Sequence, residues 1–151
     1  MKASEIMTRD PACVSADDTI AHAAQLMEQN DCGCIPVIRA ADDNCVIGVI
    51  TDRDIAVRGV ARGRAPETQV SELMSSSLYC CNPNVSLDDV EQTMSDRQVR
   101  RVVIVDDGGC CVGIIAQADL ARAAERSELS DAEVAQVVER ISEPSRQNWR
   151  L

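Results

Sequence analysis

The sequence predicts a mixed α/β (α+β) fold: two β-α-β-β-α repeats packed about a pseudo-twofold axis, followed by a C-terminal helix. The first observation behind this is internal repetition. Residues 6–8 (Ile-Met-Thr) return as residues 73–75 (Leu-Met-Ser), and Cys13 returns as Cys80, both 67 positions later. Residues 46–55 then match residues 111–120 at an offset of 65. The shortening falls near residues 40–44 and 106–109, where a hairpin turn absorbs it.

The second observation is that each copy has the same order of patterns. A short extended piece, at residues 13–14 or 79–81, precedes an amphipathic helix. We expect Asp17 or Asp18 to cap the first helix, and Ser86 with Asp89 to form the capping box of the second. The apolar faces expected for the two helices are Ile20, Ala23, Ala24 and Met27, and Leu87, Val90 and Met94.

Two β-branched runs follow in each copy and predict a hairpin: residues 35–38 with 46–50, and 102–105 with 112–115. A closing helix begins near Thr51 or Ala116. The motifs occupy residues 1–65 and 66–124, and neither is large enough to fold alone. Residues 125–151 hold the last helix, which a capping box at 130–133 starts and Pro144 ends, with 145–151 frayed. Its apolar side is expected on its own core or on a partner subunit.

Composition limits the classes of partner. The chain of 151 residues has a net charge of −10 and is 45% apolar, without a long apolar run or a secretory signal. We therefore expect a cytoplasmic protein that binds neither membranes nor nucleic acid. Two arginine clusters suit a small phosphorylated ligand, although Arg62 and Arg64 also fit a solvated helix face. The clusters are Arg53, Arg58, Arg62 and Arg64, and Arg97, Arg100 and Arg101.

Eight cysteines are many for a chain of this kind, but none forms a C-x-x-C pair. Most lie in apolar or strand-like runs, where reduced cysteine acts as a small hydrophobe. A redox or metal role is the alternative, supported by Cys32-x-Cys34 together with Cys45, Cys80 and Cys81. Cys45 and Cys110 occupy equivalent positions of the two copies, so their pairing is conceivable.

Several motifs resemble those of one family. The order M-T, helix, G-x-x-P-V, G-V-I-T-D-R-D-I is similar to the CBS motif, and two motifs make a CBS pair, or Bateman module. The resemblance covers residues 3–124. T-D-R-D-I, R-G-V-A-R-G, P-E-T and Q-V-R-R-V resemble stand-alone CBS pairs of the mycobacterial hypoxic response protein family. The resemblance implies homodimers that bind AMP, ADP, ATP, NAD-type ligands or S-adenosylmethionine in clefts between repeats, with no required cofactor.

The first candidate site lies where a strand runs into a helix at Thr51. Free N–H groups at a helix N-terminus attract phosphate, and Thr51 and Arg53 lie there. The resemblance assigns phosphate to Thr51 and the ribose hydroxyls to Asp54. The alternative is a plain capping box, T-x-x-D, with no ligand.

The second candidate site departs from the motif. Asp119 matches Asp54, but Ala116 replaces Thr51, so we expect weaker binding there. Arg100 and Arg101 either supply phosphate contacts instead or form structural salt bridges.

By analogy with the family, each cleft takes residues from both repeats. Asp54 is then expected to face Tyr79, Cys80, Val99 and Arg100, and Asp119 to face Cys13, Gly33 and Cys34. The Tyr79 ring either stacks on adenine or packs in the core.

No catalytic motif is evident, and the lone His22 lies in the first amphipathic helix. We therefore expect a regulatory or sensory module and not an enzyme. The alternatives are a cysteine-based redox or metal sensor and a ligand-free dimer that docks on an unidentified protein target.

Overall fold

The computed structural model describes residues 1–126 and 131–142, which divide into two compact units. Unit 1 comprises Met1–Arg9, Tyr79–Ile104 and the chain from Gly113 onward. Unit 2 comprises Asp10–Leu78 and Val105–Val112. No helix in the described part of the chain is long and apolar enough to cross a membrane.

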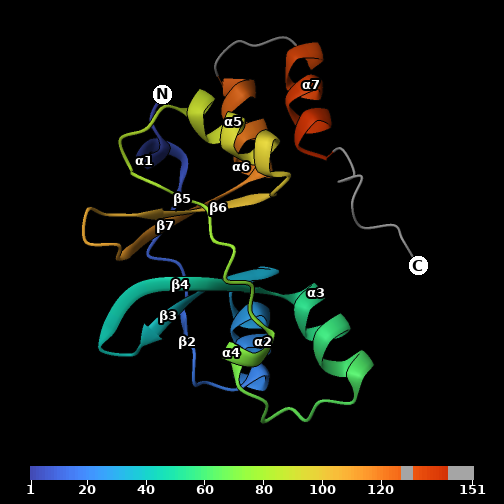
Figure 1. Ribbon diagram of the computed structural model, residues 1–151. Coiled ribbons are helices and arrows are strands. Elements are labelled where there is room, and N and C mark those ends of the chain that lie inside the picture. Colours follow the sequence, from blue (N-terminus) through green and yellow to red (C-terminus); the bar gives the residue numbers. More distant parts are fainter. Residues whose placement is uncertain (127–130, 143–151) are drawn as a thin grey trace. The chain divides into compact units, whose positions relative to one another are not determined.

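Unit 2 contains a three-stranded sheet in the order β2-β3-β4 (Figure 1). Its elements are β2 (Val14–Ser15), α2 (Ile20–Gln29), β3 (Cys34–Ala40), β4 (Asp43–Thr51), α3 (Asp52–Asp54) and α4 (Val70–Leu73). β2 runs parallel to β3, and β3 and β4 form the predicted antiparallel hairpin. The chain continues from α3 as a π-helical turn and then a 3-10 turn, Ile55–Gly59 and Val60–Arg62.

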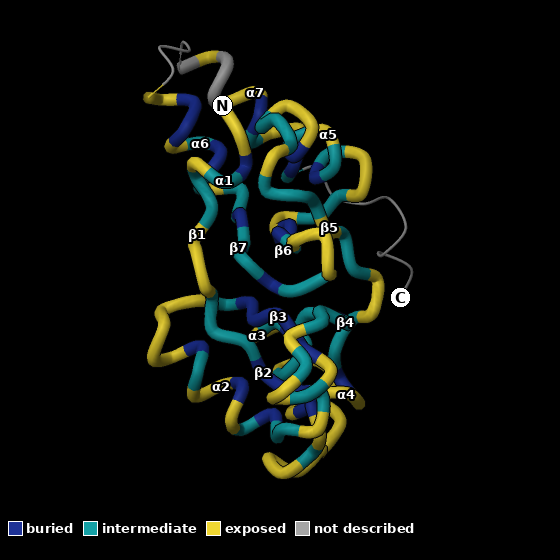
Figure 2. Tube along the Cα trace, turned by 90° about the vertical axis from the view of Figure 1, so that its left-hand side faces the viewer, coloured by how far each residue is buried: buried dark blue, intermediate teal, exposed yellow. Residues whose placement is uncertain are grey.

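The core of unit 2 forms between α2, the sheet and α4; Figure 2 shows the buried positions of α2 and β3. Ile20, Ala23 and Met27 are buried as predicted, but Ala24 is exposed, so its assignment to the apolar face was wrong. The partly buried Leu26 packs against the core instead, because a longer apolar side chain reaches it from the edge of the face.

The cap of α2 also differs from the prediction. Thr19, and neither Asp17 nor Asp18, is the N-cap, and its hydroxyl accepts the His22 N–H at 3.1 Å. Asp18 lies in the preceding turn, where its carboxylate accepts the Ser15 N–H at 3.0 Å. Aspartate and threonine both suit turns and helix caps. Here Asp18 stabilises the turn and Thr19 caps the helix.

Unit 1 contains a four-stranded sheet in the order β1-β7-β6-β5. The turn of its central β6–β7 hairpin, Val105–Val112, is assigned to unit 2. β5 runs parallel to β6, and β1 is antiparallel to β7. Ser86 caps α5, as predicted, by accepting the Asp89 N–H at 3.1 Å. The elements are α1 (Ala3–Ile6), β1 (Thr8–Arg9), β5 (Cys80–Cys81), α5 (Leu87–Arg97), β6 (Arg101–Val105), β7 (Cys111–Ala116), α6 (Gln117–Arg126) and α7 (Asp131–Ser142).

The predicted C-terminal helix is α7, and it docks on its own unit. Val137 and Ile141 are buried, and the Arg140 guanidinium lies 2.7 Å from the Glu91 carboxylate on α5. The Gln117 amide on α6 donates to the Val138 carbonyl at 2.9 Å. Ser130 of the predicted capping box, Pro144 and residues 145–151 lie outside the described residues.

Each repeat gives its first segment to the other repeat's unit. α1 and β1 come from the start of the first repeat but belong to unit 1, whereas α4 and Ser75 come from the start of the second and belong to unit 2. Ser75 pairs with Val49 through two backbone hydrogen bonds of 2.9 and 3.0 Å. In unit 1, Thr8 lies opposite Ile114 in the antiparallel β1–β7 pair. The exchange explains why a single repeat lacks part of a complete unit.

Two glycines make room for the exchanged segments. A Cβ on Gly48 would lie 2.6 Å from the Ser75 carbonyl oxygen, which real Cβ atoms essentially never do. At the equivalent Gly113, the obstacle is the side chain of Met7. A methionine side chain can rotate away, whereas a paired backbone carbonyl cannot.

We therefore predict that Gly48→Ala lowers the free energy of unfolding by roughly 1–3 kcal/mol, through overpacking. Gly113→Ala should have a clearly smaller effect because Met7 can adjust. Urea denaturation of both variants measures the difference. Equal effects would show that the close approach to Ser75 is not what demands glycine.

Candidate functional site

The Thr51–Asp54 segment forms a reciprocal capping box between β4 and α3. The Asp54 N–H donates to Thr51 Oγ1 at 3.1 Å, and the Thr51 N–H donates to Asp54 Oδ2 at 3.0 Å. The Thr51 hydroxyl donates to the same Oδ2 at 2.9 Å. The T-x-x-D spacing therefore forms a capping box, as expected from the sequence. The other carboxylate oxygen, Asp54 Oδ1, lies 3.8 Å from Arg58 Nε, which is beyond hydrogen-bonding distance.

The first N–H groups of this helix already have partners. The Asp52 N–H donates to the Gly33 carbonyl at 3.0 Å, and the Arg53 N–H donates to the Asp52 carboxylate at 2.8 Å. With the Asp54 N–H bound to Thr51, the first three donors are occupied. The expectation that free N–H groups at this terminus attract phosphate therefore lacks its structural basis.

The second copy repeats the backbone geometry without the hydroxyl. The Ala116 N–H donates to Asp119 Oδ2 at 2.8 Å, and the Gln117 N–H donates to the Arg100 carbonyl at 3.0 Å, as Asp52 does to Gly33. The difference lies at the other carboxylate oxygen. Asp119 Oδ1 accepts from Arg122 at 3.0 Å, within hydrogen-bonding distance. The side chains of Asp54 and Asp119 are similarly exposed, at 15% and 17%. The two carboxylates therefore differ in their bond to arginine and not in their exposure to solvent.

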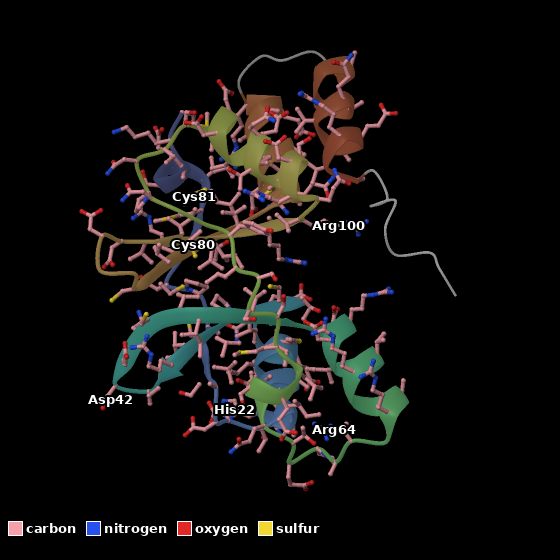
Figure 3. The ribbon with its side chains drawn as sticks, viewed as in Figure 1. His22, Asp42, Arg64, Cys80, Cys81 and Arg100 are labelled. Atoms are coloured by element: carbon pink, nitrogen blue, oxygen red, sulfur yellow. The ribbon has the colours of Figure 1, made fainter. Side chains whose placement is uncertain are left out.

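The remaining candidate residues of unit 1 lie around β5 and β6. Figure 3 shows Cys80 on β5 and Arg100 immediately before β6. Arg100 and Arg101 are exposed, and neither forms an ion pair with a carboxylate of a described residue, so the salt-bridge alternative finds no support there. The guanidinium of Arg97 lies over the Tyr79 ring, 5.1 Å from its centroid. Val99, half-buried, precedes this strand.

The other candidate residues belong to unit 2. Cys34 is buried and pairs with Thr51 across the β3–β4 ladder, which places the G-x-x-P-V motif beside the capping box. Gly33 lines a shallow, open depression of about 420 Å³ together with Asp52 and Cys32. A Cβ on Gly33 would lie 2.8 Å from the Asp52 carboxylate. The half-buried Cys13 is hydrogen-bonded to Cys111, and this bond lowers the pKa of the Cys13 thiol against the opposing effect of burial.

Unit 2 thus holds the candidate residues Cys13, Gly33, Cys34, Thr51, Arg53 and Asp54. The other candidates, which include Arg100 and Asp119, belong to unit 1. The predicted pairing of residues from different units stays a prediction. Sequence reasoning missed Arg122 and Gln117. The i,i+3 spacing of Asp119 and Arg122 was the available signal for the ion pair, whereas nothing local indicates the bonds of Gln117 to α7.

The cysteines do not form a metal centre among the residues that the structure describes. No three or more histidine, cysteine, aspartate or glutamate side chains converge there as metal ligands. None of the eight cysteines is in a disulfide, and burial raises the pKa of the Cys81 thiol.

The two-repeat architecture agrees with a comparison against protein families. The model of the CBS domain matches residues 3–59 and 70–126, once per repeat. The chain belongs to the CBS-domain family. The resemblance stated from the motifs is thereby confirmed, and the protein is a CBS pair with an added C-terminal helix.

Two curated relatives of this CBS pair cover most of its length. CBS domain-containing protein YhcV of Bacillus subtilis is 47% identical over 117 residues, 78% of this chain and 81% of its own. Hypoxic response protein 1 of Mycobacterium tuberculosis is 35% identical over 143 residues, 94% of each chain.

Solved CBS structures share the fold. Hypoxic Response Protein I, crystallised with two coordinated zinc ions, has a TM-score of 0.72 at 36% identity and covers 81% of this chain and 98% of its own. CBSX2 in complex with AMP has a TM-score of 0.72 at 20% identity, over 84% and 98% of the two chains. The CBS pair of MJ0100, with 5-methylthioadenosine and S-adenosyl-L-methionine, has a TM-score of 0.75 at 22% identity, over 85% and 98%. At these identities, the last two show the fold alone.

The capping geometry predicts opposite effects in the two repeats. Thr51→Ala should lower the free energy of unfolding by about 1 kcal/mol, because the Asp54 N–H loses its side-chain acceptor. Ala116→Thr should raise it by roughly 0.5–1 kcal/mol by supplying the hydroxyl that the second copy lacks. Thr51→Ser is the matched control and should stay near wild type. Urea denaturation decides, and an unchanged Thr51→Ala variant would contradict the capping role.

Proposed function

We propose that this CBS pair is a regulatory module that binds an adenine nucleotide, such as AMP, ADP, ATP or an NAD-type ligand, without transforming it. The observation that carries the proposal is the Asp54 carboxylate. One of its oxygens is fixed by the Thr51 backbone and hydroxyl, and the other lies beyond hydrogen-bonding distance from Arg58. A carboxylate held in this way can accept a ribose hydroxyl without losing its structural bonds.

The relatives support the ligand class. CBSX2 binds AMP, and the CBS pair of MJ0100 binds 5-methylthioadenosine and S-adenosyl-L-methionine. These ligands share an adenosine and differ in what is attached to it. Adenosine recognition is therefore the part most readily carried over to this chain, whereas the attached group depends on the charges nearby.

The charges available here favour a phosphate. Arg53 is exposed two residues after Thr51. Arg100, just before β6, and Arg101, its first residue, are exposed and form no ion pair among the described residues. In a chain of net charge −10, unpaired cations near a candidate site are well suited to recruit an anion. We assign Thr51, Arg53 and Asp54 to the first site and Asp119 to the second.

The module is proposed to act through binding and not through catalysis, as a homodimer with an unidentified protein target. His22, the single histidine of the sequence, is exposed on α2 (Figure 3), and this position on the surface of a helix supports a binding role over a catalytic one.

The first test is isothermal titration calorimetry with AMP, ATP and NAD. Asp54→Ala should weaken binding of the preferred nucleotide by roughly 10–100-fold, the value of a hydrogen bond to a charged group. Asp42→Ala, an exposed acid in the β3–β4 turn, removes the same charge and should leave affinity unchanged. Undiminished binding by Asp54→Ala would refute the assignment.

The second site gives a distinct prediction, because Arg122 competes for Asp119. Arg122→Ala should strengthen the weaker of the two binding events by several-fold, since Asp119 Oδ1 becomes available to ribose. Arg126→Ala, an exposed arginine in the last turn of α6, should not. If calorimetry shows that Arg122→Ala weakens the second event, the arginine contributes to binding instead.

A further inference from the structure

Cys45 and Cys110 lie directly opposite each other within unit 2. Cys45 is on β4, Cys110 immediately precedes β7, and the two are partners in an isolated antiparallel bridge. They are also equivalent positions of the two repeats, 65 residues apart. The fold thus brings together two thiols that the repeat places at the same point of each hairpin.

The hydrogen bond beside this bridge defines its geometry. The Val46 N–H donates to the Gly109 carbonyl at 3.2 Å, which joins the residue after Cys45 to the residue before Cys110. This pattern identifies the cysteines as a non-hydrogen-bonded pair, in which the Cα atoms of opposite residues lie about 4.5 Å apart and side chains share one face. Disulfides join Cα atoms roughly 4.4–6.8 Å apart, so the backbone already meets the requirement.

The surroundings of the two thiols differ, although both are free and partly exposed. The Arg39 guanidinium donates to Cys45 Sγ at 3.7 Å. Asp106, which anchors the turn by accepting the Cys110 N–H at 2.9 Å, raises the pKa of Cys110, with smaller contributions from burial, Cys45 and Asp43. Exchange chemistry therefore starts more readily at Cys45, and Cys110 is positioned as the second thiol.

We propose that Cys45 and Cys110 form a reversible disulfide by exchange with a small-molecule disulfide such as oxidised glutathione. The Cys45 thiolate attacks one sulfur of the small disulfide, forming a mixed disulfide and releasing one thiolate. Cys110, after losing its proton to solvent, attacks Cys45 Sγ and expels the second thiolate. The two protein thiols are oxidised, and one small disulfide is reduced to two thiols.

The bond would tie β4 to the Val105–Val112 hairpin segment of unit 2. Because it closes a long loop, it restricts the unfolded chain and raises stability in the oxidised state only. This modification does not depend on the proposed nucleotide site, and either proposal can fail alone.

The test equilibrates the full-length protein in glutathione buffers of increasing oxidised fraction, then alkylates the free thiols. Trypsin releases residues 40–53 and 102–122, which we expect to be joined, with fragmentation between Cys110 and Cys111 placing the link at Cys110. The oxidised protein should melt roughly 5–15 °C higher than the reduced protein, and dithiothreitol should reverse the shift.

Variants separate this pair from the other cysteines. Cys45→Ser and Cys110→Ser should each abolish the link and the redox-dependent melting shift, whereas Cys32→Ser, an exposed thiol removed as a matched control, should keep both. A link to Cys111, a link between two chains that disappears on dilution, or persistent free Cys45 at high oxidised fraction would each overturn the proposal.

Discussion

The structure depends on the pairing of each repeat's first segment with the closing strand of the other repeat. Ser75 bonds to Val49, and Thr8 pairs with Ile114. Each contact lies two residues before the capped position, Thr51 or Ala116, so it fixes the end of the strand from which the next helix starts. Gly48 and Gly113 permit this approach. The position of both candidate carboxylates therefore follows from a backbone contact between repeats and not from local helix propensity.

The two carboxylates make the same backbone hydrogen bond but differ in whether their second oxygen also bonds to an arginine. Asp54 and Asp119 each accept the N–H of the residue three positions earlier. What differs is the arginine: one at i+4 stays 3.8 Å from Asp54, whereas one at i+3 reaches Asp119 at 3.0 Å. The difference originates in the sequence, because the position three residues after the aspartate holds Val57 in the first repeat and Arg122 in the second. Only the second repeat therefore has an arginine at the position from which it bonds to its aspartate.

The sequence predicts local features well and long-range ones poorly. Hairpins, the Ser86 cap and the Thr51 box follow from periodicity and spacing, and all are present. The assignment of Ala24 to the buried face was wrong because the small apolar side chain of alanine fits either face of a helix. The bonds from Asp52 to Gly33 and from Gln117 to Arg100 join distant residues through backbone atoms, which carry no sequence signal. Both bonds use backbone N–H groups at a helix start, where the sequence alone predicts free donors for a phosphate.

Strand β4 holds residues of both the proposed disulfide and the proposed nucleotide site, and it is long enough to keep the two apart. Cys45 and Thr51 are six residues apart, or about 20 Å along an extended strand, so the thiol cannot touch a ligand at Thr51. A change of register also lies between them, because Val46 pairs with Ile38 but Gly48 with Val37. A bulge of this kind bends and twists the strand locally between the two positions. We therefore expect oxidation at Cys45 to alter stability much more than nucleotide affinity, which calorimetry on the oxidised and reduced protein would measure.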